Sequence, residues 1–200
     1  LALSEIYSLG LAAGEVYFWG AAYGEVVSKD SRPHGFEFAA TAITAGPQHD
    51  CAVDSEANAW CWGLNYSVET TSTRTGKLGV GASGVSLSYT PVEATAESVR
   101  AIAAGWDHTC AITLSDEVWC WGMDDRGELG NSSMFRTPEL APAAVFGGIR
   151  ADEIGAGDRL TCLITTGGEL MCAGLNESGQ LGIAPDMDRH HELQTIVLPD

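Results

Sequence analysis

The six cysteines of this 200-residue chain are the residues best suited to chemistry. They form three couples with one shared spacing: Cys51 and Cys61, Cys110 and Cys120, Cys162 and Cys172. Each couple flanks a turn symmetrically, so an antiparallel hairpin would place its two members opposite one another, within disulfide range. A zinc site is disfavoured because the spacing lacks the short knuckle of structural zinc ligands. We predict three disulfides within hairpins and an oxidising compartment; buried free cysteines are the alternative.

Three of the four asparagines stand in acceptor sequons for N-linked glycans: Asn65, Asn131 and Asn176. So many sequons among so few asparagines favour glycosylation of at least one, which needs a eukaryotic secretory route. The alternative is that Asn65 and Asn176 are turn residues that happen to be followed by a serine.

The remaining polar residues offer no catalytic, metal or cofactor site. His49 and His108 each stand two residues before a cysteine, and a position shared in this way predicts a structural hydrogen bond inside its own repeat. The pair His190-His191 lacks metal-ligand spacing and reads as a solvated loop. There is no nucleophile elbow and no phosphate-cradling glycine loop before a helix. The many carboxylates could meet in pairs, but spacing alone does not show it.

The chain contains four versions of one repeat unit, and these units position the cysteines, asparagines and histidines described above. The units lie at residues 2–27, 43–65 (continued at 76–79), 101–130 and 154–182. The anchors are Trp19-Gly20, Trp62-Gly63, Trp121-Gly122 and Ala173-Gly174. The first unit is degenerate, and its residues at the cysteine positions are read as Ser8 and Phe18. Because both cysteines are missing together, this unit supports pairing inside the hairpins of the others.

Within a unit, bulky residues alternate with period two, as in Val118 to Trp121, which indicates strands with both faces buried. Units of this length with four short strands predict the blades of an all-β propeller. We place the repeats at about 1–41, 42–98, 99–150 and 151–200 within one domain. The glycine after each Trp is expected to form the turn leaving the strand. Residues 92–100 predict strand, turn and strand rather than helix; an α/β solenoid is the alternative architecture.

The stretch GWDHTCAITLSDEVWCWGMDDRGELG resembles the repeat of the regulator of chromosome condensation family, nearest to its secreted, cysteine-bearing members. Residues 43–182 match in three units, whereas the first unit departs at Val27 and the fourth at Leu160 and Ala173. The resemblance implies a seven-bladed propeller of four-stranded blades, of which four units make a partial ring. Family members include an exchange factor for a nuclear small GTPase and a secreted inhibitor of β-lactamases.

The net charge of −17 excludes some classes of partner. A nucleic-acid binder or a protein bound to an anionic membrane needs a basic surface, and this chain has 10 basic against 27 acidic residues. No apolar run approaches the length of a membrane span. Without a signal peptide or initiator Met, the sequence is expected to be a mature chain or a fragment.

We therefore predict a non-enzymatic, secreted or cell-surface module for protein interaction or structural scaffolding. Its partners would be other proteins, further copies or the remaining blades, and it needs no cofactor. The loops Tyr66–Thr75 and Gly182–Gln194 are expected to carry the contacts. One alternative is a secreted enzyme inhibitor that binds through aromatic residues on one face. Another is a hydrolase or lyase with acidic residues at the propeller mouth; nucleotide exchange is not expected, because it also needs positive charge.

Overall fold

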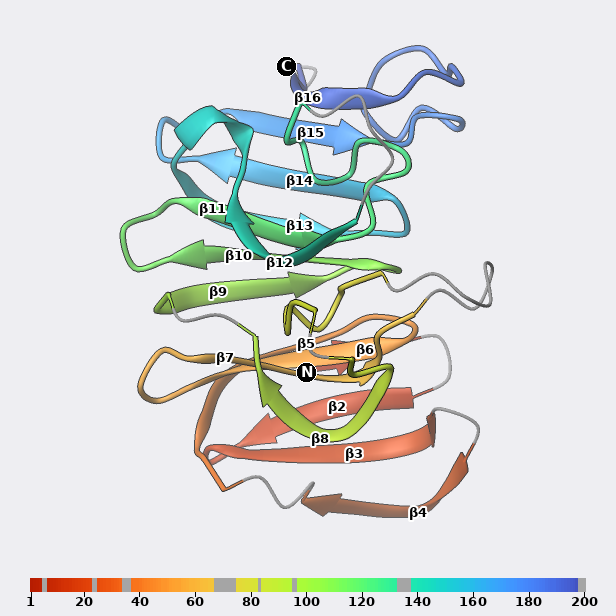
Figure 1. The fold of residues 1–200 in the computed structure, drawn as a ribbon, viewed down its shortest axis with the longest axis vertical. Coiled ribbons are helices and arrows are strands. Elements are labelled where there is room, and N and C mark those ends of the chain that lie inside the picture. Colours follow the sequence, from red (N-terminus) through yellow and green to blue (C-terminus); the bar gives the residue numbers. More distant parts are fainter. Residues whose placement is uncertain are drawn as a thin grey trace.

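The computed structural model describes residues 1–4, 7–22, 25–33, 37–66, 75–82, 84–94, 97–132 and 138–197. Within these ranges the chain forms four antiparallel sheets of four strands each, paired in chain order (Figure 1). The strands are β1 (Ala2–Leu3), β2 (Tyr7–Ala12), β3 (Glu15–Ala22) and β4 (Glu25–Pro33); β5 (Ala40–Ala45), β6 (His49–Asp54), β7 (Ala59–Leu64) and β8 (Leu87–Glu93); β9 (Val99–Ala104), β10 (His108–Thr113), β11 (Val118–Gly122) and β12 (Glu139–Ala144); β13 (Ala151–Ala156), β14 (Leu160–Thr165), β15 (Leu170–Gly174) and β16 (His190–Thr195).

The sheets stack as successive blades, from the red N-terminal sheet to the blue C-terminal sheet in Figure 1. The first strand of each later sheet lies at the inner edge, where β5 contacts β9 and β9 contacts β13. The last strand of each sheet, β4, β8, β12 or β16, forms its other edge. The all-β prediction is confirmed, and the helical content of the described residues is one 3₁₀ turn, Phe146–Gly148.

The core lies between the blades, in three apolar layers. Each layer joins one face of a sheet to the opposite face of the next, so the two middle sheets bury both faces, as the alternating sequence predicts. The layer between the third and fourth blades consists of Cys110, Ile112, Val118, Cys120, Leu129, Val145, Ala151, Leu163 and Ala173.

The glycine of each Trp-Gly pair has a different role from the one that its sequence suggests. Gly122 is the last residue of β11, where it still pairs directly opposite His108, and its φ is +109°. A Cβ atom there would lie 2.5 Å from the Cα of His108 and 2.6 Å from the Asp107 carbonyl oxygen. Close approach of two backbones therefore requires glycine at this position.

The first blade has a register that the repeat alignment misplaced by one residue. Leu9, not Ser8, lies opposite Phe18, and Ser8 lies opposite Trp19. The reason is a shorter hairpin, closed by Ala13 and Gly14 with φ values of +53° and +84°. Neither Leu9 nor Phe18 is a cysteine, so the joint absence of both partners still holds.

Two sequence predictions concern the segments between strands. Within residues 92–100, β8 ends at Glu93 and β9 begins at Val99, so this segment joins two strands as the sequence predicts. The loop predicted to run to Gln194 is wrong in its second half, because β16 begins at His190 and covers the edge of β15, where His190 pairs with Gly174. Most of the other predicted contact loop, residues 67–74, lies outside the described residues.

A candidate protein-binding groove at the inner end of the blades

The six cysteines form three disulfides, each between directly opposed residues of a hairpin: Cys51–Cys61, Cys110–Cys120 and Cys162–Cys172. The Cα atoms of each pair are 4.1 Å apart. No cysteine is free, which leaves no thiolate for nucleophilic chemistry. The disulfides of the second and third blades lie on the face that meets the following blade, so these two bonds belong to the inter-blade layers.

The two repeated histidines join neighbouring blades. Nε2 of His49 lies 2.7 Å from Oγ1 of Thr109, and Nε2 of His108 lies 2.9 Å from Oγ1 of Thr161. Burial lowers the pKa of His108 to about 4 and that of His49 well below its usual range, so both rings are neutral near pH 7. The predicted structural role is right, but the hydrogen bonds connect two repeats instead of lying within one.

A buried lysine, which the sequence reasoning did not single out, joins the second and third blades. Nζ of Lys77 lies 2.6 Å from Oδ1 of Asp107 and 2.7 Å from Oε1 of Gln48, and the side chain is fully buried. Desolvation lowers the pKa of Lys77, and the Asp107 carboxylate opposes that effect. The Lys77 carbonyl oxygen also accepts hydrogen bonds from Thr109 and Trp121, each at 2.9 Å.

The Ala-Gly turns after β5, β9 and β13 together form a groove with a volume of about 340 Å³. The turns touch one another: the amide of Trp106 donates to the Gly157 carbonyl at 3.1 Å. A Cβ on Gly105 would lie 2.6 Å from that same oxygen, so the repeated glycine sets how closely the turns pack. The lining residues are Ala45, Pro47, Ala104, Gly105, Trp106, Ala156, Gly157 and Asp158.

The groove combines a repeated frame with three side chains that differ between repeats. The residue after the glycine is Pro47 in the second blade, Trp106 in the third and Asp158 in the fourth. A half-buried tryptophan is the residue type most enriched at the energetic centres of protein interfaces. A carboxylate beside it fits a basic group of a partner. One alternative from the sequence was a hydrolase with acidic residues at the propeller mouth. Glycoside hydrolysis needs a pair of carboxylates, and the residues that line the groove include one carboxylate, that of Asp158.

The sequon asparagines differ in accessibility. Asn65 and Asn176 are buried, and their Nδ2 atoms donate to the carbonyl oxygens of Val85 and Ala184, each at 2.8 Å. A glycan is attached at this nitrogen, so burial argues against glycosylation of these two residues in the folded chain. Asn131 is only partly buried. Asn65 and Asn176 thus have the turn role that was the alternative interpretation.

The other polar candidates are accounted for by local contacts. Nε2 of His190 lies 3.0 Å from Oδ1 of Asp186, at the start of β16 and not in the solvated loop that its sequence suggests. The described residues contain no group of three or more potential metal ligands. Nor does any helix in the described ranges have the length and apolar character needed to cross a membrane.

Four-stranded antiparallel blades stacked around a shared inner edge define a β-propeller, here an arc of four blades. The family model described as the regulator of chromosome condensation (RCC1) repeat matches residues 99–128 and 152–180, in the third and fourth blades. This chain belongs to the RCC1 repeat family, whose propellers are scaffolds for protein interactions.

The curated relatives are much longer than this chain. It is 34% identical over 150 residues to the ultraviolet-B receptor UVR8 of Arabidopsis thaliana, covering 73% of this chain and 32% of the receptor. It is 27% identical to the X-linked retinitis pigmentosa GTPase regulator homolog of Caenorhabditis elegans, covering 74% and 10%. The probable E3 ubiquitin-protein ligase HERC4 of Homo sapiens is 30% identical over 92 residues, 8% of its length.

Solved structures share the fold. Yeast RCC1 (Prp20), solved bound to Kap60, matches with a TM-score of 0.81 at 21% identity, over 99% of this chain and 48% of that one. Human WBSCR16 matches with a TM-score of 0.77 at 16% identity, over 97% and 50%. The arc thus corresponds to about half of each of these proteins.

Proposed function

We propose that this chain is a non-enzymatic protein-binding scaffold of an oxidising compartment, secreted or displayed at a cell surface. Its contact surface is the groove in which Pro47, Trp106 and Asp158 follow the repeated Ala-Gly turns. The observation that carries the proposal is this arrangement of an apolar groove with an aromatic centre on a rigid frame. The three disulfides support the oxidising compartment.

The chemistry of the groove favours a partner segment with an apolar side chain beside a basic one. The apolar group would pack on Trp106 and Pro47, and the basic group would face Asp158. The net charge of −17 adds long-range attraction for such a partner, and this attraction weakens as salt increases.

A capture experiment tests this proposal. Wild-type chain, Trp106→Ala and Leu114→Ala are immobilised, exposed to extracellular fluid of the native source, cross-linked and compared by quantitative mass spectrometry. Leu114 is the control because it is 61% exposed at the other end of β10 from the groove. Wild type and Leu114→Ala should enrich the same protein, and Trp106→Ala should lose it. Retention by Trp106→Ala would exclude the groove, and no enrichment over the reduced, unfolded chain would exclude a scaffold.

The captured partner also decides between a scaffold and an inhibitor. An enzyme that loses activity when the wild-type chain is added, but not with Trp106→Ala, would establish the inhibitor form of the proposal. A partner without such an activity supports a purely structural role.

The compartment has its own test, independent of the partner. Free thiols are blocked in the native source before lysis, and the intact mass of the chain is measured. We expect no blocked cysteine among the six, because all are paired. Six modified cysteines would place the native chain in a reducing compartment and contradict the proposal.

Glycosylation is the remaining part of the extracellular proposal. In a eukaryotic secretory host we expect a glycan at Asn131 and none at Asn65 or Asn176, because these two are buried. Glycosidase treatment in heavy-oxygen water followed by peptide mass spectrometry reports which asparagine carried one. A glycan on Asn65 or Asn176 of the folded, secreted chain would contradict the burial argument.

A further inference from the structure

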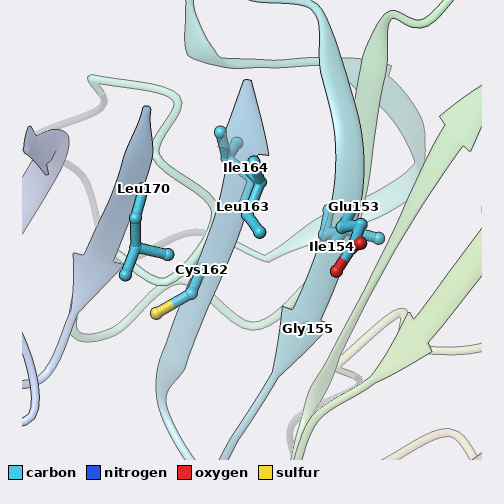
Figure 2. A pocket seen from close by; sticks show the side chains of 7 residues that line it. All are labelled: Glu153, Ile154, Gly155, Cys162, Leu163, Ile164 and Leu170. Atoms are coloured by element: carbon cyan, nitrogen blue, oxygen red, sulfur yellow. The ribbon is translucent and has the colours of Figure 1, made fainter. Parts of the chain in front are cut away.

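A pocket of about 230 Å³ lies on the fourth blade, against β13, β14 and the start of β15 (Figure 2). By strand register, Cys162 and Ile164 in its wall correspond to Cys110 and Ile112, which belong to the apolar layer between the third and fourth blades. This surface therefore has the chemistry of a blade-packing face. The groove at the inner end of the blades differs, because its polar groups are placed for a ligand.

One backbone carbonyl of the groove lacks a hydrogen bond that its counterpart makes. The Trp106 amide donates to the Gly157 carbonyl of the next turn at 3.1 Å. The residue at the position of Trp106 in the second blade is Pro47, which has no N–H to donate to Gly105. Within the described ranges, no donor bonds to the Gly105 carbonyl oxygen. Gly105 is buried and lines the groove, so a partner that donates to this oxygen relieves an unsatisfied acceptor.

The N–H groups of the same turns are already used or turned inward. The amide of the glycine in each turn donates across its own turn, at 2.8 to 2.9 Å: Gly46 to His49, Gly105 to His108 and Gly157 to Leu160. Trp106 is half-buried, and its Nε1 is buried with no partner among the described residues. The exposed part of the indole ring is therefore carbon. These turns thus present acceptors and an aromatic surface to a partner, rather than donors.

The negative charge of the groove comes from Asp158. Asp107, which follows Trp106, is paired with the buried Lys77 at 2.6 Å, and this ion pair cancels its charge. Asp158 is the carboxylate among the lining residues, and it follows the glycine to which the Trp106 amide is bonded. Trp106 therefore adjoins two acceptors, the carbonyl of the residue before it and the carboxylate of the neighbouring turn.

We propose that the groove binds an arginine of the partner, whose guanidinium lies on the Trp106 indole and donates to the Gly105 carbonyl and the Asp158 carboxylate. This inference rests on the proposed function and names the basic group of the partner. A guanidinium has five donors and no acceptor, and its plane stacks on an aromatic ring while its edges reach acceptors on two sides. An ammonium concentrates its donors at one strongly hydrated point. The neighbouring apolar side chain of the partner packs on Pro47.

Four peptides that differ in one residue test this assignment. Each is an acetylated, amidated Gly-Leu-X-Gly in which X is arginine, lysine, citrulline or dimethylarginine, and binding is followed at low salt by the NMR signals of Trp106. The arginine peptide should bind about tenfold more tightly than each of the others, because lysine loses the stacking plane, citrulline the charge and dimethylarginine part of the donors. Equal affinity for the arginine and lysine peptides would overturn the proposal, as would no shift of the Trp106 signals with the arginine peptide.

Two variants should each erase one of these differences. Pro47→Ala restores an N–H that should donate to Gly105, so the preference for arginine over dimethylarginine should shrink, whereas loss of the proline ring weakens all four peptides alike. Asp158→Asn removes the charge, so the preference for arginine over citrulline should disappear. Leu114→Ala, at the far end of β10, should change no affinity. A preference that survives its matched variant would contradict the corresponding contact, and circular dichroism verifies that the variants are folded.

The native partner separates this inference from the proposed function. Before capture, the extracellular fluid is treated with phenylglyoxal, which modifies arginine, or with an acetylating reagent, which modifies lysine. Arginine modification should abolish the enrichment that depends on Trp106, and lysine acetylation should leave it. Enrichment that survives arginine modification would overturn the arginine and leave the protein-binding groove standing. Enrichment that does not depend on Trp106 would overturn the groove itself.

Discussion

Asp124 stands where two other blades carry an asparagine, and this difference predicts a pH-dependent weakness. Oδ1 of Asp124 accepts a hydrogen bond from the Leu129 amide at 3.1 Å, as Asn65 and Asn176 accept from Leu78 and Leu181. The asparagines also donate from Nδ2 to a carbonyl oxygen at 2.8 Å. Oδ2 of Asp124 is buried without a hydrogen-bond partner among the described residues. Replacing Asp124 with asparagine should therefore stabilise the fold.

The magnitude follows from the pKa. Burial raises the pKa of Asp124 from 3.8 to about 6, with a smaller contribution from the neighbouring Asp125 carboxylate. This shift corresponds to about 3 kcal/mol of stability, fully present below pH 3.8 and lost as the pH rises to 6. Asn is neutral at every pH, so Asp124→Asn should be more stable than wild type by up to about 3 kcal/mol at pH 8. The advantage should shrink towards zero at pH 4.

Urea unfolding under non-reducing conditions at pH 4, 6 and 8 measures this difference. Asp125→Asn is the matched control because it makes the same charge change one residue away, on a side chain that is only partly buried. We expect Asp125→Asn to show little pH-dependent gain. An equal gain for Asp124→Asn at pH 4 and pH 8, or an equal gain for the control, would refute the titration of a buried carboxylate as the cause.

Three further predictions concern contacts between blades. Gly105→Ala should cost about 1–3 kcal/mol by overpacking against the Gly157 carbonyl, whereas Gly157→Ala, with its nearest neighbour 3.8 Å away, should unfold at nearly the wild-type urea midpoint. Lys77→Met should cost about 3–5 kcal/mol because it leaves the Asp107 carboxylate desolvated and unpaired, and additional replacement of Asp107 by Asn should recover part of that loss in the same assay. The imidazole NMR signals of His49 and His108 should not titrate between pH 7 and 5.5, because burial lowers the pKa of both rings in the folded chain. Since these folded pKa values lie below the unfolded value of 6.5, the free energy of unfolding should fall as the pH drops from 6.5 towards 4. Normal titration near pH 6.5 would show that the rings are not desolvated.

Much of the fold was predictable because the same local sequence pattern recurs in successive repeats. The equal spacing of the cysteine couples predicted which cysteines oppose one another, since a hairpin of fixed turn length determines its own register. Where the turn length changes, the prediction failed: the shorter Ala13-Gly14 hairpin places Leu9 opposite Phe18. Strand β16 was missed for a different reason. Its sequence, HHELQT, does not alternate strongly between apolar and polar residues, and the strand is defined by its hydrogen-bonded pairing with β15.

The candidate groove could not be found from the sequence. Pro47, Trp106 and Asp158 are separated by 59 and 52 residues in the sequence. Only the stacking of the blades brings these three different side chains together, each after the same Ala-Gly turn. The same holds for the partners of His49 and His108, which lie one repeat further along the chain.

The sequence by itself determined the blade: its strands, its hairpin disulfides and its two apolar faces, because these depend on contacts within about 50 residues. The tertiary structure alone decided what depends on one blade meeting the next. It placed His108 beside Thr161, Lys77 beside Asp107 and the three Ala-Gly turns in one groove. The physical reason is that stacking brings together residues that no local pattern connects.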